Sequence, residues 1–551
     1  MRIAILIKNF DMLENWELRI IEYILQEPTL NLVLLVKDGR RERLADGFAV
    51  KIKNLLKSKK IASRFLFAIQ KRVEQRIYKK RFTVDKSAII KQLEDIKTIY
   101  LYPKRINYVD RFSDIDRDIL TEYNLDIILR FEFNIIRGAI LEASRYGIWS
   151  FHHADNSINR GGPAGFWEIV LNQPVVGVTL QVLTSELDGG LIIDKAYFNR
   201  YHSFVKTSQH ILESSVSLFI KNIKRLQSGY FKPTKSLVYY NPLYRLPDPW
   251  ILLRYIFGFY MNISMKVIKR LSIKLSNIRY RCWSLFIGYG QFMTSTLYRL
   301  TPVELPKNSF WADPFIVKYK SDYYIFFENY DYRINKGKIS CGKIEGNTIV
   351  DVVDVLDRDY HLSYPHIFRD NDDIFMIPES HQNRRLDIYR CVKFPLEWEL
   401  YSSAFEGESV VDAIIHTDSC GEKWLFLNKS SNIATVPFEN ELYIYKIDSL
   451  KMNKIVPHRQ NPVIIDSSRA RNGGAVFEYE NEFYRPSQAS IDTLYGKALN
   501  INRIKKLTLD EYEEETITTV EPNFYKNLDG IHHMHQLDDV FVIDASYKYL
   551  V

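Results

Sequence analysis

Residues 146–193 read YGIWSFHHADNSINRGGPAGFWEIVLNQPVVGVTLQVLTSELDGGLII. A short β-like run ends in polar residues near Ser150, and a Gly/Pro-rich loop, a second β-like run and an acidic turn with two glycines follow it. Glycine and proline at this density mark loops between elements, and loops on a rigid scaffold often carry function. The stretch therefore predicts an active-site edge better than it predicts a packed core.

Four motifs in this stretch follow a recognisable order, namely GIWSFH at 147–152, RGGP at 160–163, GVT at 177–179 and LDGG at 187–190. In order and spacing they resemble the formyltransferase family, the folate-dependent group that includes the methionyl-tRNA, glycinamide-ribonucleotide and amino-sugar N-formyltransferases. One position departs from that family, because Ser150 stands where the family carries its catalytic asparagine. The resemblance implies a Rossmann-like α/β fold and 10-formyltetrahydrofolate as the cofactor.

The resemblance also assigns roles to residues of this chain. It implies catalytic roles for His152, Asp188 and Ser150, and binding roles for Arg130, Phe131, Arg160, Gly161, Gly162 and Thr179. Formyl transfer passes through an oxyanion, which His152 would stabilise while relaying protons, and Asp188 would orient that histidine. A serine hydroxyl reaches less far than an asparagine amide, so Ser150 is a poorer donor to the oxyanion. The alternative is that His152 and Asp188 are remnants on a formyltransferase-like scaffold that was recruited for binding.

The length and composition predict a multidomain globular protein. The chain has 551 residues, of which 46% are apolar and 26% are charged, so two to four domains with ordinary cores are expected. Its four cysteines form no CxxC pair, so no metal site is predicted and a reducing compartment is favoured. The first residues enter a strand pattern without a signal-peptide pattern, which predicts a cytoplasmic protein.

The opening of the chain predicts a parallel, doubly wound sheet. An apolar run at 2–7, an amphipathic stretch at 14–25 and a second apolar run at 30–36 form a β-α-β pattern. No G-x-G-x-x-G follows the first run, so a dinucleotide site is not expected. We place a formyltransferase-like domain at 1–230, with a basic stretch at 51–81 that is either a solvated helical insertion or a contact for an anionic partner.

A basic aromatic linker is expected at 231–304. Between 249 and 292, apolar and aromatic residues alternate with Arg and Lys, and the charges interrupt the run too often for a membrane-spanning helix. Two interpretations stay open. The segment is either a helical linker packed between domains or a basic amphipathic helix on an anionic membrane surface, which would make the protein membrane-peripheral.

The C-terminal part, 305–551, carries an internal repeat. Five units begin near residues 311, 361, 410, 471 and 530, and each joins a small polar cluster to two β-like runs, which predicts a five-bladed β-propeller. Its inner strands would bring polar side chains to a central channel. The expected channel residues are Asp313, Glu328, His361, Glu379, Asp412, Arg471, Arg485 and His532, with Asp544 at the end of the last run.

The pieces WADPF (311–315), FFE (326–328), HLSYP (361–365), IPES (377–380), FPLEW (394–398) and YRPSQ (484–488) carry a second resemblance. They are similar to the N-terminal domain of glucosamine inositolphosphorylceramide transferase and, more distantly, to five-bladed glycoside hydrolases. Paired carboxylates in a channel are suited to acid and base work on a glycosidic bond, although a fold alone does not establish that activity.

Together these features predict formyl transfer from 10-formyltetrahydrofolate to an amino sugar, nucleotide- or lipid-linked, in surface-glycan synthesis. The alternative is a glycan-processing or glycosyltransferase-like protein whose site lies in the propeller, with a non-catalytic formyltransferase-like domain. Nucleic acid is not an expected partner, because the basic residues cluster in the insertion and the linker and form no recognition motif.

Overall fold

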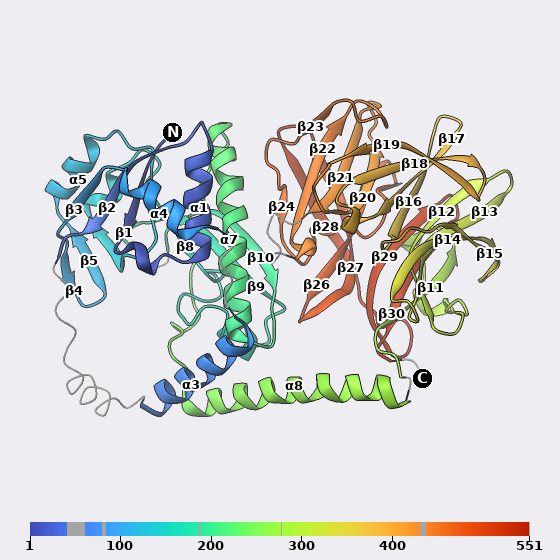
Figure 1. Ribbon diagram of the computed structural model, residues 1–551, viewed down its shortest axis with the longest axis horizontal. Coiled ribbons are helices and arrows are strands. Elements are labelled where there is room, and N and C mark those ends of the chain that lie inside the picture. Colours follow the sequence, from blue (N-terminus) through green and yellow to red (C-terminus); the bar gives the residue numbers. More distant parts are fainter. Residues whose placement is uncertain (41–60, 80–83, 187–188, 277, 430–436, 550–551) are drawn as a thin grey trace. The chain divides into compact units, whose positions relative to one another are not determined.

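A computed structural model of the protein describes residues 1–40, 61–79, 84–186, 189–276, 278–429 and 437–549 (Figure 1). The chain divides into two compact units, Met1–Asn262 and Ile263–Val551. Helices and strands are mixed in the first unit, whereas strands dominate the second. The α/β character predicted for the N-terminal half and the β-rich character predicted for the C-terminal half are both confirmed.

The first unit is built on a seven-stranded sheet with the order β10-β9-β8-β6-β1-β2-β3. Its strands are β1 (Arg2–Ile7), β2 (Asn31–Asp38), β3 (Thr98–Leu101), β6 (Ile127–Arg130), β8 (Ile148–His152), β9 (Val175–Val182) and β10 (Leu191–Asn199). Strands β1, β2, β3, β6 and β8 run parallel, and β9 and β10 add an antiparallel edge. Parallel strands read as continuous apolar runs because both faces are covered, which explains the sequence RIAILI in β1.

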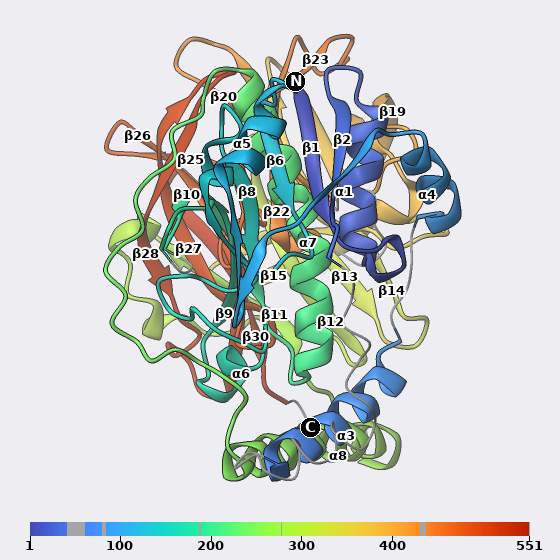
Figure 2. The same cartoon turned by 90° about the vertical axis from the view of Figure 1, so that its left-hand side faces the viewer.

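Helices cover both faces of this sheet, and α1 and α7 pack against each other (Figure 2). The helical elements are η1 (Phe10–Met12), α1 (Asn15–Gln26), α3 (Ile61–Ile77), α4 (Lys86–Glu94), α5 (Asp114–Thr121), η2 (Ala139–Glu142), α6 (Trp167–Val170) and α7 (Phe204–Gln227). A capping box at Glu14 starts α1, and the Ser203 hydroxyl caps α7. On the other face, Leu120 of α5 and Ile140 of η2 pack on Ala4. A small sheet of β4 (Lys104–Ile106), β5 (Val109–Phe112) and β7 (Ile135–Gly138) completes the unit.

The segment expected to be a linker, 231–304, contains two regular elements that belong to different units. Helix α8 (Pro249–Ser276) starts in the first unit, where Leu252 and Tyr255 join a core with Phe166 and Phe204. Strand β11 (Cys282–Tyr289) pairs along its whole length with the last strand of the chain, β30 (Val540–Tyr547). The C-terminal sheets therefore begin before residue 305, and the sequence did not separate β11 from the equally apolar helix that precedes it.

Among the described residues, the second unit contains five antiparallel sheets that follow one another along the chain. They are β12 (Ser309–Tyr319), β13 (Asp322–Asp331), β14 (Lys336–Glu345) and β15 (Thr348–Leu356); β16 (Ser363–Asp370), β17 (Asp373–Glu379), β18 (Leu386–Lys393) and β19 (Glu397–Ala404); β20 (Val410–Thr417), β21 (Lys423–Lys429), β22 (Glu441–Ile447), β23 (Ile455–Pro457) and β24 (Ile464–Ile465); β25 (Phe477–Tyr479), β26 (Glu482–Ile491), β27 (Leu494–Leu507) and β28 (Tyr512–Val520); and β29 (Leu528–Leu537), β30 and β11. Short 3-10 turns lie at Phe292–Thr294, Leu297–Arg299, His381–Asn383 and Phe438–Asn440.

The cores of the second unit lie between neighbouring sheets. Phe326 of the first sheet meets Trp398 of the second edge-on, with ring centroids 5.8 Å apart. Trp424 of the third sheet is buried in the same cluster. Aromatic residues bury large apolar areas, so the high aromatic content of the chain serves this packing. The five repeat units predicted from sequence correspond to these five sheets.

Leu285→Ala should destabilise the C-terminal unit, because Leu285 is fully buried in β11. Removing a buried leucine side chain costs about 2–5 kcal/mol of unfolding free energy. Urea denaturation would measure the loss, and hydrogen exchange should rise in β11 and β30. Leu400→Ala is the matched control, because Leu400 is half exposed in β19, and its effect should stay within about 0.5 kcal/mol. Equal small effects of both variants would contradict a structural role for β11.

Candidate functional site

In the first unit, strands β6 and β8 bring Arg130 and Ser150 together. The Arg130 Nη1 donates to the Ser150 hydroxyl at 3.0 Å, and its Nη2 donates to the Phe133 carbonyl at 2.6 Å. Ser150 is buried and Arg130 is anchored by backbone carbonyls. The side chain expected to replace the family's catalytic asparagine is therefore held in a hydrogen bond within the domain.

His152 lies at the end of β8, and its Nε2 is 2.6 Å from the Asn159 carbonyl. The Asn159 side chain in turn donates to Glu168, whose pKa is raised by burial. The neighbouring His153 packs against Trp16, and burial lowers its pKa to about 3, so it is neutral and acts as an aromatic core residue. Asp188, the expected partner of His152, lies outside the described residues.

The Arg160–Gly162 loop packs against a later segment of its own unit. The Arg160 guanidinium lies over the Tyr239 ring at 4.6 Å, and its Nη2 donates to the Leu237 carbonyl at 3.2 Å. A Cβ on Gly161 would lie 1.9 Å from the Tyr244 carbonyl oxygen, so only glycine fits there. These contacts give the loop a packing role.

The two remaining residues of the predicted N-terminal site have structural contacts too. Thr179 is buried, and its hydroxyl donates to the Ala154 carbonyl at 2.9 Å. Phe131 meets Trp16 edge-on, with the ring centroids 5.6 Å apart. Every described member of this predicted site is therefore engaged by its own domain.

In the second unit, β-bulges place the polar residues of the predicted channel. Asp313, Tyr364 and Asp412 have positive φ angles of 53°, 44° and 49°, and each lies at a register shift in the first strand of its sheet. His532 lies at a corresponding shift in β29. A bulge turns a side chain away from the regular alternation, and strained non-glycine residues cluster at functional sites.

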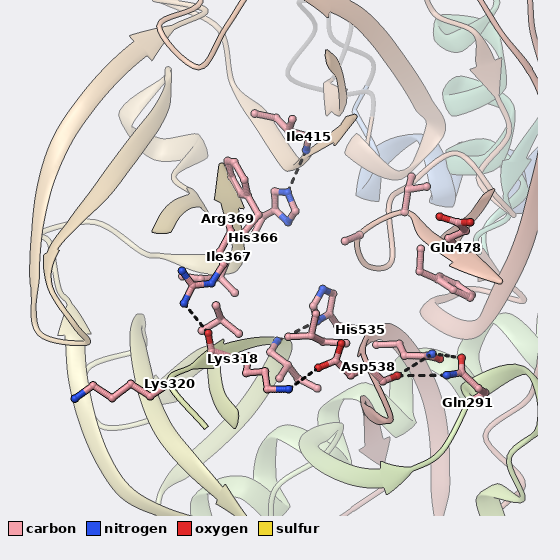
Figure 3. A pocket seen from close by; sticks show the side chains of 18 residues that line it. Gln291, Lys318, Lys320, His366, Ile367, Arg369, Ile415, Glu478, His535 and Asp538 are labelled. Carbon is pink, nitrogen blue, oxygen red and sulfur yellow. Dashed lines mark hydrogen bonds and ion pairs between the residues drawn. The ribbon is translucent and has the colours of Figure 1, made fainter. Parts of the chain in front are cut away.

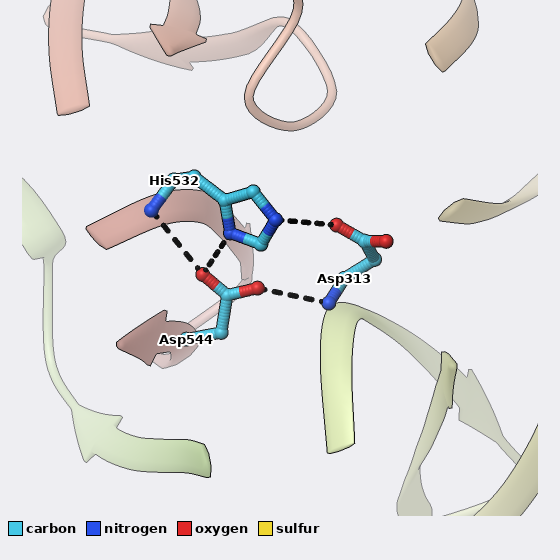
Figure 4. Close-up of side chains that lie close together, drawn as sticks. All are labelled: Asp313, His532 and Asp544. Atoms are coloured by element: carbon cyan, nitrogen blue, oxygen red, sulfur yellow. Dashed lines mark hydrogen bonds and ion pairs between the residues drawn. The ribbon is translucent and has the colours of Figure 1, made fainter. Parts of the chain in front are cut away.

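His532 connects two carboxyl groups from different sheets (Figure 4). Its Nδ1 is 2.7 Å from Asp544 Oδ1, and its Nε2 is 3.4 Å from Asp313 Oδ1. Asp544 also accepts from the Asp313 backbone N–H at 2.9 Å, and Trp283 stacks on the imidazole with centroids 3.8 Å apart. The ligand atoms of these three residues lie within 4.8 Å of one another, which is also a spacing compatible with a metal ion. Because Asp544 and His532 already bond to each other, we interpret the group as a hydrogen-bonded relay.

Arg471 connects the remaining carboxylates of the cluster. Its Nε donates to Asp412 Oδ2 at 2.5 Å, and its Nη2 lies 3.7 Å from Glu379 Oε2. The guanidinium lies over the ring of Tyr495 at 5.0 Å. His381 Nδ1 is 2.9 Å from the other oxygen of Glu379. Buried charges are stable only when paired in this way.

The carboxyl groups of the cluster are held in different protonation states. Burial, followed by the charges of Asp313 and Glu379, raises the pKa of Glu328 well above its usual range. Burial also opposes ionisation of Glu379, but the His381 hydrogen bond and the charge of Arg471 outweigh it and hold its pKa at about 2. For Asp313, burial raises the pKa to about 7. These environments favour the protonated form of Glu328 and the ionised form of Glu379.

Of the predicted channel residues, Arg485 does not join the cluster. It lies in β26 and pairs with Glu514 at 2.7 Å, with a further bond from its Nη2 to the Arg469 carbonyl at 2.8 Å. The period-two alternation of the strand turns it toward this buried pair, so its assignment to the channel is wrong. His361 lies beside the cluster, with its Nε2 3.4 Å from Glu328 Oε1.

The sequence prediction missed several neighbours of the cluster, namely Trp283, Tyr364, His381 and Tyr495. Tyr364 occupies the bulge position of the second sheet, where its backbone N–H donates to Asp313 Oδ2 at 3.3 Å. Asp313 lies two positions before Phe315, where regular pairing resumes, and Tyr364 lies two positions before His366 in the same way. Aligning the units on this position, and not on the first polar residue, would have found Tyr364. His381 and Trp283 lie outside the repeat and left no comparable signal.

A separate cavity of 790 Å³ is lined by residues farther along the same first strands (Figure 3). His366 and His535 lie in its wall, and each accepts a backbone N–H through a ring nitrogen. Burial lowers the pKa of His366 to about 3 and that of His535 to about 4, so both are neutral. Lys318 and Asp538 form an exposed ion pair at 3.0 Å at its rim.

The Asp313 carboxyl should make the stability of the protein depend on pH. Its pKa is about 7 in the folded protein and its ordinary value is 3.8, so the folded state retains a proton that the unfolded state loses. Stability is therefore unaffected below pH 3.8 and falls as the pH rises to about 7. Asp313→Asn removes this loss, so its stability relative to wild type should rise over this range by up to about 1.4 kcal/mol per pH unit.

Urea denaturation between pH 5 and 7 would measure this difference, with Asp331→Asn as the control. The Arg333 hydrogen bond holds the pKa of the exposed Asp331 at about 2, so that variant should run parallel to wild type over this range. A parallel curve for Asp313→Asn would show that its carboxyl ionises normally.

Comparison with known proteins finds a family domain that is similar to most of the second unit. Residues 296–547 match the family described as "Glucosamine inositolphosphorylceramide transferase 1, N-terminal". The Oryza sativa subsp. japonica protein named glucosamine inositolphosphorylceramide transferase 1 is 34% identical over 220 residues, which is 39% of this chain and 29% of that protein. Its namesake from Arabidopsis thaliana is 33% identical over 214 residues, or 38% of this chain and 27% of that protein. The chain thus spans less than a third of the length of these curated relatives.

Solved structures resemble each half of the chain at low scores. A thermostable family-43 glycoside hydrolase has a TM-score of 0.32 at 14% identity and covers 44% of this chain and 90% of its own. Glycinamide ribonucleotide transformylase 1 from Symbiobacterium toebii has a TM-score of 0.28 at 15% identity and covers 45% of this chain and 94% of its own. At these scores, neither likeness carries a functional argument.

The relatives overturn the prediction of formyl transfer to an amino sugar. The curated proteins that match are named as transferases of glucosamine inositolphosphorylceramide, which fits the alternative interpretation. The geometry agrees with this correction, because Ser150 is bound to Arg130 and the Arg160 loop is covered by its own domain. Folate binding itself stays a prediction.

Proposed function

We propose that this protein is a glycan-processing, glycosyltransferase-like protein of glycolipid or surface-glycan synthesis. Its site is the carboxylate cluster of the second unit, and the five sheets act as blades of a propeller around it. The formyltransferase-like unit is a non-catalytic scaffold in this proposal. The observation that carries it is a pair of glutamates in one cluster, Glu328 beside His361 and Glu379 beside His381 and Arg471, with the pKa of Glu328 raised and that of Glu379 lowered.

This pair is suited to making or breaking a glycosidic bond. Such reactions need one carboxylic acid to protonate the leaving oxygen and one carboxylate to face the positive charge that develops on the sugar ring. Glu328, protonated beside His361, is the acid, and Glu379, held by His381 and Arg471, is the anion. Two titratable groups whose environments separate their pKa values identify acid and base roles.

The substrate proposed for this site is a lipid-linked sugar. The matching relatives are named for glucosamine inositolphosphorylceramide, and the match lies in the unit that carries the cluster. The aromatic rings of Trp283 and Tyr495 next to His532 and Arg471 add flat apolar surfaces of the kind on which sugars stack.

Turnover by the full-length protein should depend on both glutamates. Purified wild type would be incubated with a panel of nucleotide sugars and glycosyl inositolphosphorylceramides, and products would be followed by mass. Glu328→Gln and Glu379→Gln should each lower turnover by roughly a hundredfold to ten-thousandfold. Glu399→Gln is the control, because Glu399 pairs with Arg390 on the exposed edge strand β19. Full activity of both cluster variants would refute the proposed site.

A second candidate function is sugar binding without chemistry. The curated relatives have more than two thirds of their length outside the matched region. The catalytic part of those relatives could lie in that remainder, which favours a binding role for the matched region. Titration with the same sugars separates the two functions. Wild type that binds a sugar but turns over no member of the panel, with binding weakened in Glu379→Gln, would identify a binding module.

A further inference from the structure

Helix α8 carries an exposed apolar stripe along its length. The stripe consists of Trp250, Leu253, Phe257, Met261, Ile268, Leu271 and Leu275, whose side chains are between 44% and 82% exposed. Their spacing of three or four residues, with Ser264 between Met261 and Ile268, places them on one face of the helix. Scattered apolar residues are ordinary on protein surfaces, but a continuous stripe of this length marks an interaction surface.

The opposite face of the first turns of α8 is fixed to the first unit. Leu252, Tyr255 and Phe259 are buried. The Tyr255 hydroxyl donates to Glu74 of α3 at 2.7 Å and accepts from the Phe204 backbone N–H at 2.8 Å. Figures 1 and 2 show α3 beside this part of α8. The stripe is thus held outward by contacts on the far side of the helix.

All of the charges on α8 are positive. Arg254, Lys266, Lys269, Arg270 and Lys274 lie on the helix, and it contains no Asp or Glu. At 100° per residue, Lys266 and Arg270 lie opposite the stripe, and Lys269 and Lys274 lie on its two flanks. Long basic side chains on the flanks extend along the apolar surface and place their charges at a water interface.

The first unit adds more positive charge next to the stripe. A cavity of 270 Å³ lies beside α8 and is lined by Arg254, Arg200 and His202, among others. On α3, Phe65 and Ile69 are exposed among Arg64, Lys71 and Arg72. The first unit therefore exposes further basic and apolar residues on α3, the helix on which the start of α8 docks.

In the described part of the chain, α8 is the one helix long and apolar enough to cross a membrane by length and composition. Its contacts argue against crossing. The first turns dock on the folded unit through Tyr255 and Phe259, and the remaining residues, 262–276, carry four Lys or Arg. A spanning helix needs about 20 predominantly apolar residues. The free part of α8 is too short and too charged for that.

We propose that α8 lies in the interface of a membrane containing anionic phospholipids. The stripe enters the boundary between headgroups and acyl chains, and the side chains beside it, Arg254, Lys269 and Lys274, contact lipid phosphates. The proposal does not depend on the glycan chemistry of the second unit. Charge complementarity selects this occupant over a second copy of the chain, because two copies would bring two cationic helices together without an acid on either.

Vesicle sedimentation of the full-length protein tests the proposal. Wild type should sediment with phosphatidylcholine vesicles containing roughly a third phosphatidylserine, and at least about tenfold less with pure phosphatidylcholine. Replacing three stripe residues, Phe257→Ser, Ile268→Ser and Leu271→Ser, should weaken binding by roughly a hundredfold. The control carries Tyr298→Ser, Leu396→Ser and Leu400→Ser, whose side chains are 67%, 53% and 50% exposed against 68%, 51% and 50% in the stripe.

A second pair of variants tests the charges. Arg254→Gln, Lys269→Gln and Lys274→Gln together should weaken binding to anionic vesicles by about tenfold or more and leave the melting temperature unchanged. The control carries Lys307→Gln, Lys526→Gln and Lys548→Gln, three exposed lysines of the second unit, and should bind as wild type does.

Four results would overturn the proposal, and the last of them concerns extraction from membranes. The first is wild type that does not sediment with anionic vesicles. The second is binding that the stripe and charge variants weaken no more than their controls do. The third is a wild-type dimer in light scattering that the stripe variant converts to a monomer, without vesicle binding, since the stripe would then cover a second copy. Wild type that alkaline carbonate fails to extract from membranes would indicate a spanning helix instead.

Discussion

The organisation of the second unit depends on how buried carboxyl groups are compensated. Asp313, Glu328, Glu379, Asp412 and Asp544 come from different strands, and all are buried or nearly so. Arg471 is the guanidinium placed among them, where it contacts Asp412 and Glu379. A low-dielectric interior does not tolerate several uncompensated anions, so some of the carboxyls must remain protonated. The pKa values of Glu328 and Glu379 differ because the His381 hydrogen bond and the Arg471 charge both act on Glu379.

Much of this arrangement was visible in the sequence, because the repeat preserved the polar position at the start of each unit. Asp313, Asp412 and His532 were found in this way, and the structure places them in one cluster. What the sequence did not show is the β-bulge at each of these positions, where Asp313, Tyr364 and Asp412 adopt positive φ angles. Tyr364 was missed for that reason, whereas Arg485 was misplaced because the regular alternation of β26 turns it toward Glu514.

The N-terminal unit shows a different limit of sequence reasoning. The order of its motifs predicted the strands correctly, and β8 and β9 carry the residues expected of them. The predicted chemistry depended on one side chain, Ser150. The hydrogen bond to its hydroxyl is donated by Arg130, which lies in another strand, twenty positions earlier in the chain. A pattern of residues along one strand does not reveal which side chain of a neighbouring strand hydrogen-bonds to a functional group in it. Motif order is therefore informative about a scaffold and much less so about its reaction.

Strand β11 has a consequence for how the protein is made. It leaves the ribosome soon after α8, yet its partner β30 is the last strand of the chain, with Cys282 opposite Tyr547. Almost the whole second unit must be synthesised while β11 waits with its edge unpaired, and exposed strand edges are prone to wrong pairing. Closure of this sheet therefore waits until β30 has left the ribosome, long after β11 has. A strand from the middle of the sequence thus makes the completion of its sheet depend on a segment that is synthesised much later.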